Sequence, residues 1–327
     1  MTEIKNTKVR IYGLLKVFVT VGILLLLVMK FSLSLSVLTK ITTPSCLAIS
    51  AAIVLFVVMS VSTNRWQVFL EQMGIKEKFW PLWKINIIAM FQGLILPSTQ
   101  GADVIRMYHL AKRHPGQVGG ASGSVLVERI FGVLIWCSVA VIGLPFVLKY
   151  VETKWTVLFA VLGFFFAAIV GTVLVMNRRI HTLYEGRRPR IKLLAKVVSV
   201  LDSIHSSLIG FPYLKVLGSS IVLILVCQMA AIVNVWLIFM AYGVSLPFYM
   251  HMAFYPVIAI IAMMPVTIGG FGVREGAFAY FYSLVGVPVE VAVSVSVVNY
   301  VFVTLIPAAI GALLCGWDQI INVFMNG

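Results

Sequence analysis

Three acidic residues of this chain lie in or beside apolar segments, and each has an arginine close to it in sequence. The pairs are Asp103 with Arg106, Glu128 with Arg129, and Glu275 with Arg274. A charged side chain in an apolar environment is costly unless it is paired or lines a wet cavity. These residues are therefore candidates for a binding or coupling site. The alternative is that they form internal ion pairs that hold helices together without any ligand.

Two of these pairs lie at the ends of two copies of one motif, P-x-T-x-G-x-x-x-x-R, at residues 97–106 and 265–274. Glycine at a helix start leaves backbone amides free for an anion, and a guanidinium adds a bidentate pair of donors, so the motif suits a phosphate. We predict that Arg106 and Arg274 hold one anionic headgroup from two sides. The predicted binding residues are Thr99, Gly101, Arg106, Arg129, Thr267, Gly269, Gly270 and Arg274. The predicted coupling or charge-pair residues, which compensate the empty site or carry protons, are Asp103, Glu128 and Glu275.

The composition indicates the environment in which these charged residues lie. Of 327 residues, 61% are hydrophobic and 11% are charged, and the mean hydropathy is +1.04. These values exclude a water-soluble globular protein and predict a polytopic membrane protein. The net charge of +14 comes from basic residues in loops beside apolar spans, where they act as topology signals, so we expect no nucleic-acid partner.

The chain shows none of the motifs of nucleotide-driven pumps, zinc peptidases or serine hydrolases. Its four cysteines stand singly in apolar runs, with no cluster of cysteine and histidine. We therefore expect no metal, no cofactor and no catalytic residue.

The fold class expected is an all-α polytopic membrane protein, a single transmembrane domain over residues 1–327. Two apolar segments, 85–97 and 251–264, are too short to cross a bilayer comfortably and end at a proline, which predicts half-helices of re-entrant hairpins. The basic stretch 177–215 is expected to be a cytoplasmic loop with an interfacial amphipathic helix, and both termini are expected to be cytoplasmic. About six full spans are predicted, at 11–30, 45–63, 124–148, 155–176, 217–242 and 291–316.

The spacing of the two motif copies, 168 residues from Pro97 to Pro265, is about half the chain. Each half then holds three spans and one hairpin, and an odd number of crossings inverts the second half relative to the first. We predict inverted repeats at 1–154 and 155–327, the architecture of a secondary transporter with its site at the repeat interface. The alternative is a chance match, because proline, threonine and glycine recur in membrane helices.

The same residues carry a resemblance to a known family. The segments 96–106, 127–132 and 265–276 resemble the transmembrane region of lysylphosphatidylglycerol synthase, a family of flippase-like membrane proteins. This resemblance implies translocation of a lipid or a lipid-linked saccharide. The soluble aminoacyl-transfer domain of the synthase is absent here, so lysyl transfer is not implied.

The function expected is transport of an anionic lipid, or of a polyprenyl-phosphate-linked saccharide, between the leaflets of a bacterial cytoplasmic (inner) membrane through a central polar cavity. One rival is an integral-membrane transferase acting on a polyprenyl phosphate or a phospholipid, with Asp103 or Glu128 as base. Another is a scaffold that recruits envelope-biosynthesis enzymes. Those enzymes and a second copy of the chain are the protein partners left open.

Overall fold

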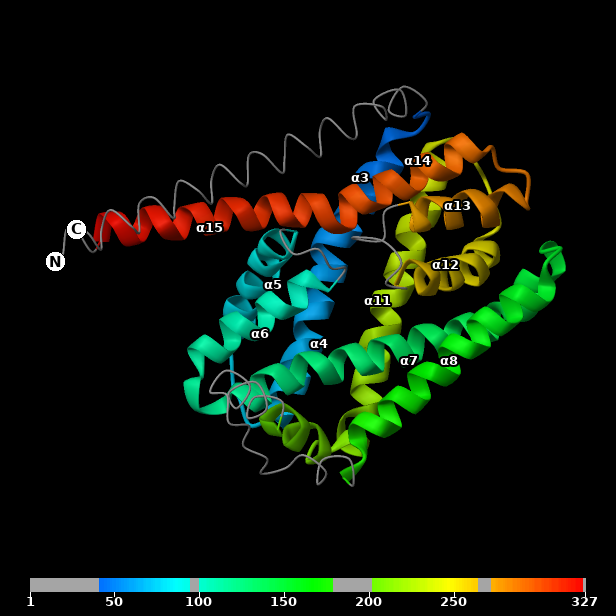
Figure 1. Ribbon diagram of the computed structural model, residues 1–327. Coiled ribbons are helices and arrows are strands. Elements are labelled where there is room, and N and C mark those ends of the chain that lie inside the picture. The colour runs from blue at the N-terminus through cyan, green and yellow to red at the C-terminus, as the bar shows by residue number, and fades with distance from the viewer. Residues whose placement is uncertain (1–40, 95–99, 179–201, 264–271, 326–327) are drawn as a thin grey trace. The chain divides into compact units, whose positions relative to one another are not determined.

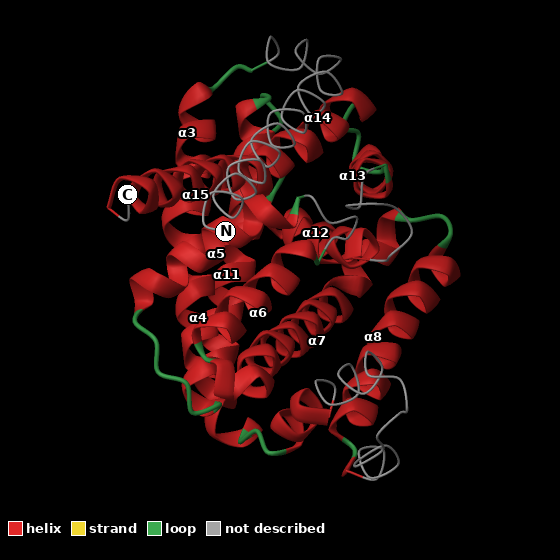
Figure 2. Cartoon of the chain, turned by 60° about the vertical axis from the view of Figure 1, so that its left-hand side comes forward, coloured by secondary structure: helices red, strands yellow, loops and turns green. Residues whose placement is uncertain are grey.

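The computed structural model describes residues 41–94, 100–178, 202–263 and 272–325, and within these ranges it contains helices and no strand (Figures 1 and 2). Among the described residues, five helical stretches are long and apolar enough to cross a membrane. They are Pro44–Gln72, Pro115–Tyr150, Lys154–Met176, Gly218–Ala241 and Val289–Gly316. They match five of the predicted spans, which confirms an all-α membrane protein. The sixth predicted span, 11–30, lies outside the described residues.

The five stretches are built from the following helices. The first contains α3 (Pro44–Ala52), the π-helical turn Ile53–Val58 and α4 (Met59–Gln72). Next come α7 (Val118–Tyr150), which follows a short 3-10 turn at Pro115–Gln117, then α8 (Lys154–Met176) and α11 (Tyr213–Ala241). The last contains α14 (Val289–Tyr300), a second π-helical turn at Val301–Leu305 and α15 (Ile306–Met325).

Two pairs of shorter helices stand where the hairpins are predicted. The first pair is α5 (Phe79–Gly93) with α6 (Gly101–Arg113), and the second is α12 (Phe248–Met263) with α13 (Val273–Ser283). The two helices of each pair pack against each other. The connections that carry Pro97 and Pro265 lie outside the described residues, and the re-entrant course of both pairs stays a prediction.

The short pairs also pack across the two halves of the chain. Helix α5 packs on α15, and α12 packs on α7. Both crossings rest on a glycine: a Cβ at Gly143 of α7 would lie 3.1 Å from the Cα of Ala253, and a Cβ at Gly311 of α15 would lie 2.3 Å from the carbonyl oxygen of Ile87. Small residues of this kind let membrane helices approach closely, because lipid gives helices no hydrophobic drive to associate.

These two glycines stand 168 residues apart, the same spacing as the two motif copies. The order of elements also agrees, since a long helix, two short helices and a long helix follow one another in each half. Both observations support an internal repeat. The repeat boundaries at 154 and 155 and the inversion of the second half stay predictions.

The basic stretch 177–215 is described only in part, because residues 179–201 lie outside the described ranges. Its end forms a short helix over residues 202–209. Leu208 of this helix is buried in a cluster with Phe69, Val127 and Phe211. The cytoplasmic placement of the stretch and its interfacial helix stay predictions.

A buried apolar cluster fixes α4, α5, α6 and α7 together. Its largest member, Trp66, is fully buried and packs with Leu70 of the same helix. The other members come from α5, α6, α7 and the turn before α5: Ile75, Leu82, Ile85, Leu110, Ala121 and Val125. This packing sets the positions of the charged residues described next, which lie on the same helices.

Candidate functional site

Helix α6 brings the first charged pair of the site into the interior. The helix begins at Gly101, and the N–H of Asp103 donates to the carbonyl of Gln100. Its start lies tightly against the end of α5, since a Cβ at Gly93 would lie 2.4 Å from the backbone nitrogen of Ala102. Asp103 and Arg106, one turn apart, both point to the buried face of α6.

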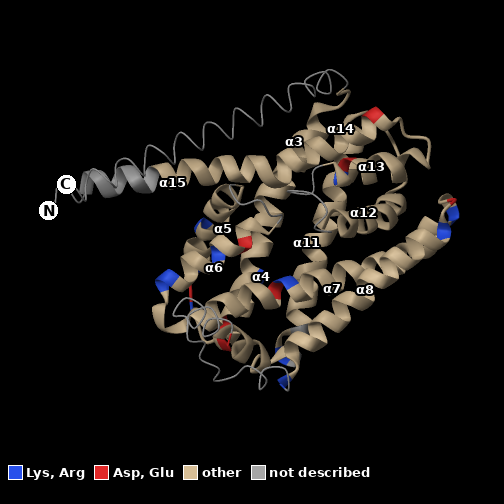
Figure 3. Ribbon diagram, viewed as in Figure 1, with Lys and Arg blue, Asp and Glu red and all other residues tan. Residues whose placement is uncertain are grey.

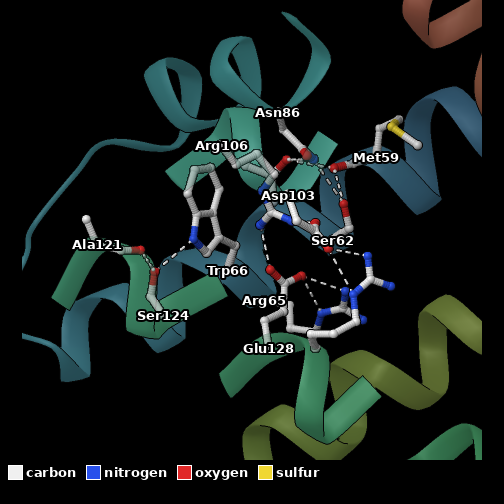
Figure 4. A network of polar contacts seen from close by, with 12 residues as sticks. Met59, Ser62, Arg65, Trp66, Asn86, Asp103, Arg106, Ala121, Ser124 and Glu128 are labelled. Atoms are coloured by element: carbon white, nitrogen blue, oxygen red, sulfur yellow. Dashed lines mark hydrogen bonds and ion pairs between the residues drawn. The ribbon is translucent and has the colours of Figure 1, made fainter. Parts of the chain in front are cut away.

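Five charged side chains from three helices form one network (Figure 4). Glu128 of α7 accepts hydrogen bonds from two arginines: Arg65 of α4 at 2.6 Å from Nη2 and 3.0 Å from Nε, and Arg106 at 2.5 Å. Asp103 accepts a bond from Arg129 Nε at 2.9 Å and lies 3.4 Å from Nη1 of Arg106. The two carboxylates are therefore joined through Arg106.

The pairing differs from the one that closeness in sequence predicts. Glu128 is bonded to Arg65 and Arg106, while the neighbouring Arg129 is bonded to Asp103. The prediction that Glu128 pairs with Arg129 was wrong, because arginines from α4 and α6 reach the carboxylate of Glu128 and Arg129 reaches Asp103 of α6 instead. The pairing of Asp103 with Arg106 is confirmed, although it is the longest contact of the network.

Arg65 is a cavity residue that the sequence analysis did not single out, since it lies just beyond the predicted span 45–63. The structure continues that helix to Gln72, and Arg65 lies inside it. The sequence does contain a signal that this helix continues. Trp66, Phe69 and Leu70 recur at the spacing of one helix face, and all three are buried in the structure. A helix that continues through residue 72 carries Arg65 into the interior.

Neutral side chains also lie next to the charged network, and Trp66 contacts it directly. The guanidinium carbon of Arg106 lies 4.1 Å from the centre of the Trp66 ring, within the range of a cation–π contact. The indole N–H of Trp66 donates to Ser124 at 3.1 Å, and the hydroxyl of Ser124 donates to the Ala121 carbonyl at 2.9 Å. Beside them, Asn86 donates to Ser62 and Thr63 of α4. Figure 4 shows Trp66 and Ser124 on one side of the network and Asn86 with Ser62 on another.

A cavity of about 210 Å³ opens on the network. All five charged residues line it, and Figure 3 shows how sparse charges are elsewhere along these helices. Its opposite wall comes from α11, through Ile224, Cys227 and Gln228, with Met263 at the end of α12. Charged groups and mostly apolar side chains thus line the same cavity, as expected of a site that takes an anionic group attached to an apolar molecule.

The second arginine of the predicted clamp has different surroundings. Arg274 donates to Glu275 at 2.5 Å and to Ser296 at 3.3 Å, and it lies 4.4 Å from the centre of the Tyr300 ring. The pairing of Arg274 with Glu275 is therefore confirmed. Glu275 also accepts a hydrogen bond from the N–H of Gly272 at 2.7 Å, so it caps the start of α13.

Arg274 is not among the residues that line the cavity around Arg106. The two-sided clamp stays a prediction. Thr99, Thr267, Gly269 and Gly270 lie outside the described residues, so their predicted roles stay predictions as well.

The order of these motifs along the chain agrees with a known membrane family. The family model described as lysylphosphatidylglycerol synthase TM region matches residues 13–311. The chain belongs to this family. The resemblance drawn from the segments around Arg106, Glu128 and Arg274 is thereby confirmed.

Curated relatives of this family member are distant. A UPF0104 membrane protein of Methanothermobacter thermautotrophicus is 23% identical over 265 residues, covering 76% of this chain and 78% of that protein. A UPF0104 membrane protein of Methanocaldococcus jannaschii is 22% identical over 281 residues, covering 80% of this chain and 82% of that protein. No solved structure matches the chain. These names identify the relatives as membrane proteins and say nothing about a substrate.

Within the described ranges, no group of three or more histidine, cysteine or acidic side chains is arranged to hold a metal ion. The charged groups that line the site are guanidinium groups and carboxylates. Such an arrangement can bind and release an anion by exchanging one set of charge-assisted hydrogen bonds for another.

Proposed function

We propose that this protein moves an anionic lipid, or a polyprenyl-phosphate-linked saccharide, between the leaflets of its membrane. The headgroup binds in the cavity at Arg106 and Arg129, and Asp103 and Glu128 compensate the arginines when the cavity is empty. The observation that carries this proposal is a buried network of five charges that lines a cavity between membrane-spanning helices. Charges buried among membrane helices are candidates for a functional role, because burying them is costly.

The exposure of the network favours a ligand over an ion-pair lock. Glu128 and Arg106 are buried, but the side chain of Arg129 is 42% exposed and borders the cavity. A lock would gain little from a partly exposed arginine, since ion pairs that face solvent contribute only about 0–1 kcal/mol. An arginine at the edge of a cavity can instead change partners from Asp103 to an incoming phosphate without leaving its place.

The packing of the short helices supports movement of the site between the two leaflets. Arg106 lies on α6, whose neighbour α5 packs on α15 from the other half of the chain. Helix α12 packs on α7, which carries Glu128. A rocking of one half against the other would therefore shift the two sides of the cavity relative to each other, which is how alternating access works in transporters built from repeats.

The test is a flipping assay in proteoliposomes. Phosphatidylglycerol labelled on its acyl chain is placed in both leaflets, and a membrane-impermeant quencher reports how quickly inner-leaflet lipid reaches the outside. We expect the protein to speed this exchange and Arg106→Gln to lower the rate by about tenfold or more, because one charge-assisted hydrogen bond contributes about 1.5–3 kcal/mol. Lys112→Ala, which removes an exposed charge from the same helix, is the matched control and keeps the rate.

A second variant tests the two-sided clamp. Loss of exchange in both Arg106→Gln and Arg274→Ala supports binding from both halves, and loss in Arg106→Gln alone confines binding to the first half. Exchange at the rate of empty liposomes with every labelled lipid and lipid-linked saccharide overturns the transport proposal. Formation of a glycosylated lipid from a sugar donor would replace it with the transferase.

A further inference from the structure

The charges that line the cavity do not balance. Three guanidinium groups, of Arg65, Arg106 and Arg129, face two carboxylates, of Asp103 and Glu128. With every group ionised, the empty cavity carries one net positive charge. A ligand with a single negative charge makes the occupied cavity neutral, whereas a doubly charged phosphomonoester or a diphosphate leaves excess negative charge in a low-dielectric site.

Gln228 adds a second, independent requirement. Its side chain is only 3% exposed and lines the cavity from α11, opposite the charged helices. Neither its amide nitrogen nor its amide oxygen has a hydrogen-bond partner, which is costly for a buried polar group. A Gln amide can donate through its NH₂ group and accept through its oxygen.

The arginines already supply donors and both carboxylates already accept from them, so Gln228 adds an acceptor that is still without a partner. Its oxygen needs an O–H or N–H group from the ligand. The Nε of Arg106, also buried and unpartnered, adds one more donor for an anionic oxygen.

From these observations we infer that the cavity selects a phosphodiester headgroup that carries one negative charge and a hydrogen-bond donor. The side-chain oxygen of Gln228 accepts the hydrogen bond from that donor. This inference rests on the proposed function and narrows its substrate class. Two lipids share the chemistry: a glycerophospholipid with a hydroxylated headgroup, and a polyprenyl phosphate esterified to a single sugar. Lipids with a bare phosphomonoester, a diphosphate or an alkyl phosphodiester lack one of the two features.

The test measures the binding of a defined lipid panel to delipidated full-length protein by native mass spectrometry. Phosphatidylglycerol has both features, phosphatidylmethanol has the single charge but no donor, and phosphatidic acid can take a second charge. We expect phosphatidylglycerol to bind about fivefold more tightly than phosphatidylmethanol, the effect of one neutral hydrogen bond, and more tightly than phosphatidic acid at a pH where the latter is doubly charged. Polyprenyl phosphoglucose is added to the panel, and its affinity relative to phosphatidylglycerol shows which of the two lipids binds better.

Two variants separate the charge from the donor. Gln228→Met keeps the size of the side chain, and we expect it to bind phosphatidylglycerol and phosphatidylmethanol equally. Arg129→Gln removes the net charge, and we expect it to lose the preference of the site for both lipids over zwitterionic phosphatidylethanolamine. Lys112→Ala is the control and keeps the wild-type order.

The wild-type panel keeps the inference testable if a variant fails to fold. Equal binding of phosphatidylglycerol and phosphatidylmethanol by the wild-type protein, with lipid exchange intact in proteoliposomes, overturns the role of Gln228 and leaves the proposed function standing. Tighter binding of the doubly charged lipid overturns the charge argument in the same way. Absence of both anionic-lipid binding and lipid exchange overturns the proposed function itself.

Discussion

Arg106 and Arg274 occupy corresponding places in the two copies of the sequence motif, and their surroundings share some contacts and differ in others. Each arginine donates a hydrogen bond to a side chain 22 residues further along, which is Glu128 for Arg106 and Ser296 for Arg274. Each also lies over an aromatic ring, at 4.1 Å in the first half and 4.4 Å in the second. The geometry is shared, but the partner is a carboxylate in one half and a hydroxyl in the other.

The two halves therefore compensate the charge of a buried arginine in different ways. Arg274 is compensated by Glu275, its neighbour in sequence, and it also contacts the neutral side chains of Ser296 and Tyr300. Arg106 instead belongs to a network that spans three helices and keeps one excess positive charge. The comparison assigns anion binding to the first half under our proposal and leaves the second half with a self-compensated pair.

The largest expected effect follows from removing the carboxylate of the first half. Glu128→Ala leaves Arg65 and Arg106 buried without their main counter-charge, and we expect it to destabilise the protein by about 3–5 kcal/mol. Ser296→Ala, at the corresponding position, removes one hydrogen bond and costs about 1 kcal/mol. Thermal unfolding in detergent measures both, and equal losses would contradict the difference between the halves.

The two glycine crossings give the next effect. A Cβ at Gly311 would lie 2.3 Å from the backbone oxygen of Ile87, so Gly311→Ala forces α15 away from α5 and costs about 1–3 kcal/mol. Gly143→Ala meets Ala253 at 3.1 Å and should cost less. Gly163→Ala, which meets nothing within 4 Å, is the control, with stability unchanged or raised by up to about 1 kcal/mol through helix propensity. We expect the melting temperature to fall most for Gly311→Ala, less for Gly143→Ala and not at all for Gly163→Ala. A larger fall for Gly143→Ala than for Gly311→Ala would contradict the closer approach of α15 to α5.

The smallest effect on stability is expected at the rim of the network. Arg129→Gln leaves Asp103 in contact with Arg106, and the side chain it removes is 42% exposed, so the cost is about 1 kcal/mol or less. The same variant should remove most of the anion preference in the lipid panel. A large loss of stability would instead mean that Arg129 is part of a structural lock. Chemical denaturation with lipid binding measured on the same preparation separates the two outcomes.

Much of the fold could be predicted from local properties of the sequence. Apolar runs of the right length predicted the described spans, because a bilayer leaves backbone groups no partner except those of their own helix. The start of α6 at Gly101 and the single turn between Asp103 and Arg106 follow from local geometry. The pairing of Arg274 with Glu275 likewise needed only neighbours in the chain.

The partners of Glu128 could be decided only by tertiary structure. Arg65 lies 63 residues away in sequence, on a helix whose end cannot be located from apolar windows alone. Gln228 looks like an ordinary polar residue of an apolar span until α11 is placed opposite α7. The sequence by itself determined that charged groups lie within the membrane helices, because composition and helical periodicity are local. Which of these charges share a cavity depends on how distant helices cross, and only the packing of side chains at those crossings decides that.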